Sequence, residues 1–348
     1  MLLRRKVVPT SNNSNDGSFP TTSKESSNDH GNNDTNDNKQ AAPNQLKRML
    51  AIAFCFTLYL VFFPEIIGKV AWTSLPKLPS SVDRFLNHVF YQVIDGLDTQ
   101  GEVNCMNWGY KYSTADSTDK VNIELELELD PKDEPERYCM QMYHKLGTAA
   151  GDMAGKHVLE VGSGRGGGAS YIKRYLHPES VTGLDYSSKA VEFSNQKHAN
   201  AVPGLVYIQG DAEHLPFQDE EFDLVINVES SHCYEHFTLF LSEVKRDLKP
   251  GGHLSWVDFR DASAIPALNQ AFIDAGFDVV KTEDVTANVV ASMAASGEQK
   301  KKLIDRQVPK FARSIFYGFA GLEGTNLYKK LDNRKLIYTH KLARKKEL

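Results

Sequence analysis

Residues 156–168 read Lys-His-Val-Leu-Glu-Val-Gly-Ser-Gly-Arg-Gly-Gly-Gly, a short apolar stretch that runs directly into a glycine-rich segment. The apolar part predicts a buried β-strand over residues 156–161, and residues 169–176 have helical character. A strand, a glycine-rich turn and a helix in this order begin a doubly wound α/β sheet. Glycines allow the backbone to approach a bound molecule where a Cβ atom would collide. The Gly-x-Gly-x-x-Gly spacing also occurs in NAD sites, so it does not identify the ligand by itself.

A second predicted strand, residues 181–185, ends in an acidic residue. Asp185 lies about 20 residues beyond the glycine-rich turn, where a carboxylate can accept hydrogen bonds from both hydroxyls of an adenosine ribose. NAD-binding proteins share this feature. The two motifs together therefore indicate an adenosine-containing ligand without deciding which one.

The remainder of the sheet is predicted from later parts of the chain. Apolar segments indicate further strands at residues 205–209, 224–228, 253–257 and 336–341. The strand at residues 205–209 is followed by Gly-Asp-Ala-Glu-His-Leu-Pro-Phe at residues 210–217. The strand at residues 253–257 is preceded by Leu-Lys-Pro-Gly-Gly at residues 248–252. Strands that alternate with helical segments are typical of a parallel α/β sheet.

The order of these segments resembles that of the class I S-adenosylmethionine-dependent methyltransferases. The resemblance implies a Rossmann-like α/β fold, with a seven-stranded, mostly parallel sheet and helices on both faces. It also implies S-adenosyl-L-methionine as the cofactor, in place of NAD. This cofactor carries no phosphate, so the glycine turn is expected to shape an adenosyl pocket and not an anion site.

The same resemblance implies roles for individual residues. The positions that match the segment around the methionine and ribose parts of the cofactor are Glu160, Gly162, Ser163 and Gly164. Asp185 matches the acid that binds the ribose hydroxyls. Asp211 and Ala212 match the positions that contact the adenine edge. Asn227 and Val228 match the floor of the site near the sulfonium.

A narrower resemblance covers residues 95–340. Residues 166–185 read GGGASYIKRYLHPESVTGLD, and residues 210–237 read GDAEHLPFQDEEFDLVINVESSHCYEHF. These stretches are similar to the mycobacterial phthiotriol and phenolphthiotriol dimycocerosate methyltransferases and to their relatives that act on fatty acids and glycolipids. This resemblance implies O-methylation of a hydroxyl or carboxyl group on a lipid-like substrate. The chain departs from the family at its N-terminus, where it extends beyond the usual start.

The candidate catalytic residues follow the fourth and fifth strands. The sulfonium is already a strong electrophile, so the protein must align an acceptor and remove its proton. His232 lies just past the fourth strand, and a neutral imidazole suits a general base. Related small-molecule O-methyltransferases use a His here with an Asp after the fifth strand, a place that Asp258 occupies. His232 could instead be only a wall residue, with His236 as the second candidate base; no metal-ligand spacing is present.

Three segments of the chain are expected around the cofactor. Residues 80–137 form an N-terminal helical or lid segment, residues 138–262 the cofactor-binding core, and residues 263–345 a substrate cap with the final strand. Clustered aromatic residues in a loop either fill a core or cover a ligand, and Trp108 and Tyr110 are candidates for both roles.

The N-terminal part differs in composition from the rest. Residues 1–46 are rich in Ser, Asn and Asp and poor in aliphatic residues, which predicts a disordered tail. Residues 47–72 contain an apolar run of about the length that a membrane helix needs, with basic residues at both ends. A segment in the membrane interface or a buried helix are the alternatives. The helix expected over residues 82–94 either faces the core or rests on a membrane.

The expected location is the endoplasmic reticulum membrane, with a single crossing and a cytosolic catalytic domain. S-adenosylmethionine is a cytosolic metabolite, and the final residues, Lys-Lys-Glu-Leu, resemble a dilysine retrieval signal. A degenerate luminal retention tag is the other interpretation. In the favoured topology, Asn12 and Asn33 would be glycosylation acceptors in the lumen.

Composition limits the function classes that remain. The net charge of −5 and the pI of about 6.1 argue against a nucleic-acid partner, which usually requires a basic domain. Three hypotheses stay open: O-methylation of a lipid-like substrate, C- or N-methylation of a sterol, quinone or phospholipid head group, and a non-catalytic cofactor-binding membrane scaffold.

Overall fold

The computed structural model describes residue 98 and residues 101–112 and 127–347. Its centre is a seven-stranded sheet in the order β3-β2-β1-β4-β5-β7-β6. The strands are β1 (His157–Val161), β2 (Ser180–Asp185), β3 (Leu205–Gln209), β4 (Phe222–Val228), β5 (Leu248–Asp261), β6 (Phe277–Asp284) and β7 (Leu336–Lys345). Only β7 runs antiparallel to its neighbours in the sheet. This arrangement confirms the Rossmann-like, mostly parallel fold.

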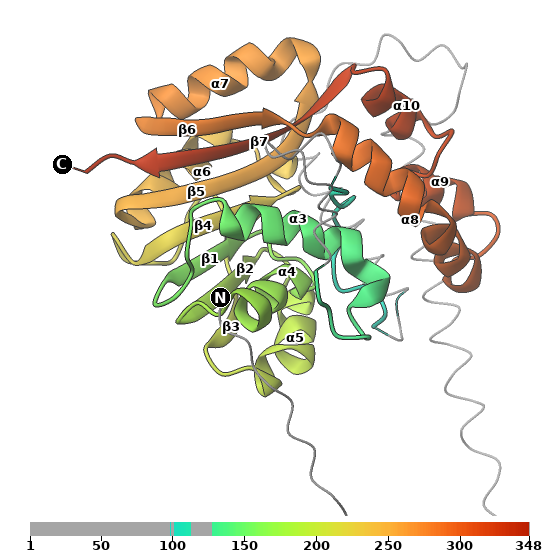
Figure 1. The fold of residues 1–348 in the computed structure, drawn as a ribbon, viewed down its shortest axis with the longest axis horizontal. Helices are drawn as coiled ribbons and strands as arrows, with labels where there is room; N and C mark the ends of the chain where they lie inside the picture. Colours follow the sequence, from blue (N-terminus) through green and yellow to red (C-terminus); the bar gives the residue numbers. More distant parts are fainter. Residues whose placement is uncertain (1–97, 99–100, 113–126, 348) are drawn as a thin grey trace, which may run out of the picture. The chain divides into compact units, whose positions relative to one another are not determined.

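The helices lie on both faces of the sheet (Figure 1). The longer ones are α3 (Arg137–Thr148), α4 (Gly167–Tyr171), α5 (Ser188–Lys197), α6 (Phe237–Asp247), α7 (Ile265–Asp274), α8 (Thr286–Gln307), α9 (Arg313–Phe319) and α10 (Asn326–Asp332). The short ones are η3 (Glu134–Glu136), η4 (Ile172–Leu176), η5 (Ala199–Ala201), η6 (Ser231–Cys233) and η7 (Ala262–Ala264).

The two faces of the sheet carry separate apolar clusters. In β4, Leu224 and Ile226 belong to the cluster shared with α3 and α4, whereas Val225 belongs to the one shared with α6 and α7. Successive side chains of a strand point to opposite faces, so a strand covered on both sides must be apolar throughout. This explains why the central strands read as continuous apolar runs.

The structure differs from the sequence-based expectation in the last third of the chain. The sequence places one strand, the final one, in residues 263–345, whereas the structure has two, because α7 ends at Asp274 and β6 begins at Phe277. Gly276, with φ of +79°, takes the left-handed conformation that ends the helix. β5 is also longer than expected at both ends: Leu248 pairs with Phe222 of β4, and the strand continues to Asp261 because it pairs with β7 that far. Residues 263–345 therefore supply two strands of the sheet besides α7–α10.

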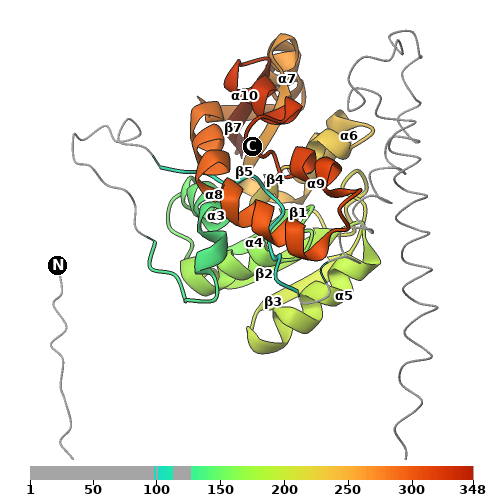
Figure 2. The same cartoon turned by 90° about the vertical axis from the view of Figure 1, so that its right-hand side faces the viewer.

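The helices α8, α9 and α10 gather beyond the end at which the parallel strands finish (Figure 1). Seen toward that end, α8 and residues 101–112 lie across the sheet (Figure 2). Ligands in open α/β sheets bind outside the carboxyl ends of the strands. Residues 101–112 and α8 are therefore the parts of the chain best placed to cover a ligand there.

The predicted tail (1–46), membrane segment (47–72) and helix over residues 82–94 lie outside the described residues. Among the helices of the described part, none combines the length and the apolar content that a membrane crossing requires.

Candidate active site

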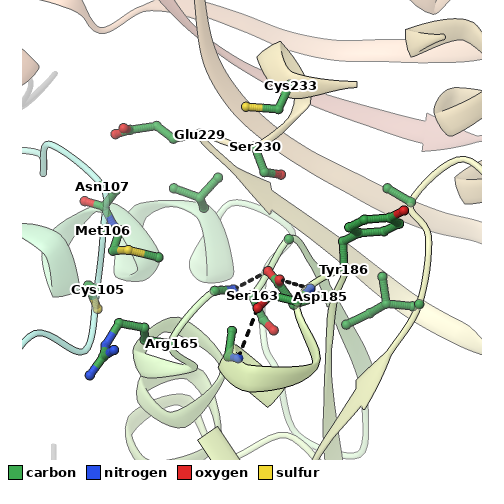
Figure 3. Close-up of a pocket in the computed structure, with 18 of the residues that line it drawn as sticks. Cys105, Met106, Asn107, Ser163, Arg165, Asp185, Tyr186, Glu229, Ser230 and Cys233 are labelled. Carbon is green, nitrogen blue, oxygen red and sulfur yellow. Dashed lines mark hydrogen bonds between the residues drawn. The ribbon is translucent and has the colours of Figure 1, made fainter. Parts of the chain in front are cut away.

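A cavity of about 160 Å³ opens at the carboxyl ends of β1, β2 and β4 (Figure 3). It is bounded by the glycine turn after β1, by residues 184–187, by residues 210–212 and by residues 228–230. The segment Asn104–Asn107 closes one side. Four loops that are far apart in the sequence thus meet at one edge of the sheet, as the doubly wound topology requires.

The first position of the glycine turn has no room for a side chain. Gly162 has φ of +77°, and a Cβ atom there would collide with the hydroxyl of Ser230. The backbone nitrogens of Gly162 and Ser163 donate to the carbonyl of Leu184, at 2.8 and 3.0 Å, which ties the turn to β2. The Ser163 hydroxyl is buried and has no partner within the described residues. A buried polar group of this kind fits a ligand with its own hydrogen-bonding groups.

Asp185 stands at the end of β2 with its carboxylate on the cavity wall. Its two oxygens accept hydrogen bonds from the backbone nitrogens of Gly164, at 2.7 Å, and Ser187, at 2.9 Å (Figure 3). These bonds fix the carboxylate between the glycine turn and the start of α5. The arrangement suits an acid that binds a pair of ribose hydroxyls.

The structure brings together most of the residues expected to bind the cofactor. Those that line the cavity are Gly162, Ser163, Gly164, Asp185, Asp211, Ala212 and Val228. Glu160 and Asn227 do not line it, because both side chains are fully buried behind its wall. Burial raises the pKa of Glu160 to about 8. The Asn227 amide donates to the Val161 carbonyl at 2.9 Å and to the Ser230 hydroxyl at 2.8 Å, so it supports the wall from behind.

A second cavity, of about 750 Å³, adjoins the first. Asn104, Cys105, Met106 and Asn107 line both cavities, so this segment is the boundary between them. The other walls come mainly from α3, α8 and α9 and include Tyr138, Cys139, Met140, Leu303, Ile304, Phe316 and Phe319. Residues 263–345, which were expected to form a substrate cap, supply part of the walls of this cavity, whereas the contribution of α3 was not predicted.

Trp108 and Tyr110 have different environments. Trp108 lines the second cavity, where its indole nitrogen donates to the carbonyl of Phe319 at 3.0 Å. Its ring also packs on Phe259, with ring centroids 5.0 Å apart. Tyr110 is 1% exposed, lines neither cavity and packs against Tyr112. Trp108 is therefore a wall of the larger cavity, whereas Tyr110 belongs to the core.

Comparison with known proteins identifies the family. Residues 159–256 match the family described as a methyltransferase domain. The phthiotriol/phenolphthiotriol dimycocerosates methyltransferase of Mycobacterium leprae is 38% identical over 237 residues, which are 68% of this chain and 83% of that protein. The chain belongs to this methyltransferase family. It is an S-adenosylmethionine-dependent methyltransferase, as the sequence predicted.

Other relatives extend this picture. The fatty-acid O-methyltransferase of Mycolicibacterium smegmatis is 36% identical over 249 residues, which are 72% of this methyltransferase and 85% of that enzyme. Among solved structures, the [4+2]-cyclase SpnF aligns with a TM-score of 0.55 at 18% identity, over 78% of this chain and 97% of that one. Geranyl diphosphate C-methyltransferase from Streptomyces coelicolor aligns with a TM-score of 0.52 at 14% identity, over 78% of this chain and 100% of that one. These two structures support the fold alone.

The predicted catalytic pair of the methyltransferase, His232 and Asp258, is in direct contact. Nδ1 of His232 lies 3.0 Å from Oδ1 of Asp258, whose carboxylate is fully buried and is also paired with Arg260 at 3.2 Å. Burial opposes the charged imidazole, but the Asp258 carboxylate outweighs it and holds the pKa of His232 well above its usual value. The ring lines neither cavity. The role of His232 as the base therefore stays a prediction. The second candidate, His236, has a side chain that is 59% exposed and also lines neither cavity.

Glu229 is a cavity residue that the sequence analysis missed. It directly follows β4, has φ of +46°, and its side chain reaches toward Asn107 (Figure 3). Oε1 accepts a hydrogen bond from the backbone nitrogen of Trp108 at 2.7 Å. Burial raises the pKa of Glu229 to about 7. The signal that could have found it is its position: an acid at the carboxyl end of a central strand, two residues after Asn227.

Proposed function

We propose that this methyltransferase transfers a methyl group to an oxygen atom of a lipid-like molecule that lies in the second cavity. The observation that carries this proposal is the contact between the two cavities. A space of about 750 Å³ has the size of a typical small-molecule site and meets the cofactor cavity along Asn104–Asn107. A substrate there would bring its acceptor group to the cofactor without passing through solvent.

The lining of the second cavity supports an amphiphilic substrate. Its inner walls include Met140, which is fully buried, and Trp108, which is 8% exposed. Its outer part includes charged side chains of α8, among them Lys302 and Arg306, which are 75% and 58% exposed. An apolar interior with a charged edge suits a molecule with a long apolar part and a polar part. The names of the relatives, which refer to dimycocerosates and a fatty acid, agree with such a substrate.

The cofactor-binding roles follow from the fit of the first cavity. When bound there, S-adenosylmethionine supplies an electrophilic methyl group on its sulfonium. Asp185 would hold the ribose hydroxyls, and the Ser163 hydroxyl is a free partner for another polar group of the cofactor. Asp211 and Ala212 would meet the adenine edge, and Val228 would lie on the floor below the methyl group.

Purified full-length protein in detergent is expected to transfer labelled methyl groups from S-adenosylmethionine into a total lipid extract. The label should appear in the organic phase and be absent with the Asp185→Ala variant, which should not hold the cofactor. Label that stays in the aqueous phase, on a polar acceptor, would rule out the lipid-like substrate while leaving methyl transfer intact.

We also propose that residues 47–72 anchor the chain in the endoplasmic reticulum membrane with the catalytic domain in the cytosol. The support is the apolar composition of the segment and the cytosolic supply of the cofactor. Expression in cells should then give glycosidase-sensitive glycans at Asn12 and Asn33, visible as a mobility shift that the double Asn→Gln variant lacks. An unglycosylated tail in membrane-bound protein would contradict this topology.

A further inference from the structure

The place where the two cavities meet contains two polar side chains whose chemistry is complementary. Asn107 lines both cavities and is 5% exposed. Its side-chain oxygen, Oδ1, accepts a hydrogen bond from the backbone nitrogen of Gly109 at 2.8 Å. Its side-chain nitrogen, Nδ2, has no hydrogen-bond partner within the described residues. A buried donor without a partner is costly, and a ligand that offers an acceptor there would satisfy it.

Glu229 supplies the acceptor at the same junction. Its side chain lines the cofactor cavity, and its carboxylate is bonded to the backbone of Trp108, the residue that follows Asn107 and lines the second cavity. Figure 3 shows Glu229 and Asn107 on the same side of the cavity, with the Glu229 side chain extending from the end of β4 toward the segment that holds Asn107. The hydrogen bond to Trp108 and the left-handed backbone at Glu229 hold the carboxylate in this position.

We propose that the methyl acceptor is a hydroxyl group, bound between the Asn107 amide and the Glu229 carboxylate, and that Glu229 is the catalytic base that takes its proton. This inference rests on the proposed function and names its acceptor class. A hydroxyl accepts one hydrogen bond and donates another, which matches this donor and acceptor pair. A carboxylate acceptor would meet the like charge of Glu229, and an alkene carbon would leave the Asn107 amide nitrogen without a partner.

The proposed step conserves atoms and charge. The hydroxyl oxygen forms a bond to the methyl carbon, the carbon–sulfur bond breaks with its electron pair left on sulfur, and the hydroxyl proton moves to the Glu229 carboxylate. The products are a methyl ether, S-adenosylhomocysteine and a protonated Glu229. The ring of His232 packs on Phe259, with centroids 4.7 Å apart, and lines neither cavity. It would therefore position the loop after β4 and not touch the acceptor.

The charged and titratable groups around Glu229 set the expected pH dependence. Burial raises the pKa of Glu229 most, and the Asp258 carboxylate from β5 adds to this effect. Tyr338 from β7, the Trp108 backbone and His232 from η6 lower it, and Cys139 from α3 lies within electrostatic range. The ionised carboxylate is the active form of a base. The rate should therefore rise with pH through the pKa of about 7 and level off above it.

The test combines product chemistry with substitution in the full-length enzyme. Labelled product from the lipid extract should survive base hydrolysis and release labelled methyl iodide with hydroiodic acid, which identifies a methyl ether. Glu229→Gln should lower kcat by about 100-fold or more, leave the Kd for S-adenosylmethionine unchanged, and remove the rise in rate near pH 7. His232→Ala should lower kcat less and keep that rise.

Asp247→Asn is the matched control, because burial also raises the pKa of Asp247 to about 7 although it lines neither cavity. This variant should keep the wild-type pH profile. A base-labile methyl ester would overturn the hydroxyl acceptor while leaving the lipid methyltransferase intact. An unchanged kcat and pH profile in Glu229→Gln would overturn its role as the base. Absence of label from every lipid would instead reject the proposed function.

Discussion

Replacing Asp185 with alanine is expected to raise the Kd for S-adenosylmethionine by about 100-fold or more. A hydrogen bond to a charged group contributes about 1.5–3 kcal/mol, and about 1.4 kcal/mol corresponds to a tenfold change in affinity. Two ribose hydroxyls would lose their partner, and the backbone nitrogens of Gly164 and Ser187 would lose theirs as well. Equilibrium dialysis with labelled cofactor measures the change directly.

Asp223→Asn is a suitable control for this substitution. Asp223 also accepts a hydrogen bond from a backbone nitrogen, that of His157 at 2.8 Å, but it stands at the start of β4, at the other end of the sheet. It should change stability without changing the Kd. If Asp185→Ala bound the cofactor as tightly as the wild type, the cavity at the carboxyl end of β2 could not be the adenosyl site.

Replacing Arg165 with alanine is expected to lower the free energy of unfolding by about 3–5 kcal/mol, because one partner of a buried ion pair is lost. Arg165 lies 3.0 Å from Asp98, and the two side chains are 2% and 3% exposed. Nε of Arg165 also donates to the carbonyl of Val103 at 2.6 Å, so the guanidinium holds the start of the segment that lines both cavities. Urea denaturation monitored by circular dichroism gives the stability change.

Arg306→Ala is the matched control. Arg306, on α8, forms an exposed ion pair with Glu102, which precedes Val103 in the same segment. The two side chains are 58% and 36% exposed, and such pairs contribute about 1 kcal/mol or less. Arg165→Ala should also weaken cofactor binding, whereas Arg306→Ala should not. Equal stability losses in the two variants would mean that burial of the Arg165–Asp98 pair has no special effect.

The cofactor cavity could be predicted from the sequence because its residues are local to strand ends. The glycine turn and Asp185 follow from the strand and turn pattern, because parallel strands end at the same edge of the sheet, whereas the role of Ser163 came from the family resemblance. Glu160 and Asn227 were placed correctly in their strands. Their side chains nevertheless face the buried side of the wall, which depends on the orientation of each residue in the pleated strand.

The second cavity and the junction could not be predicted, because they depend on contacts between distant parts of the chain. The bond from Trp108 to Glu229 joins residues 121 positions apart, and that from Trp108 to Phe319 joins residues 211 apart. β6 was not predicted either, although Gly276, whose φ of +79° ends α7 just before this strand, is a local signal for it. The sequence predicted a substrate cap over residues 263–345, but only the packing of α8 and α9 shows a cavity there.

The segment Asn104–Asn107 forms a wall of both cavities, which links the two binding events thermodynamically. Any ordering of this wall by one ligand prepares half of the site for the other. By linkage, each ligand must then strengthen the affinity of its partner by the same factor. Steady-state kinetics would show this as a KM for the lipid that falls as the cofactor concentration rises. The enzyme would thus hold its two substrates most tightly when both are present.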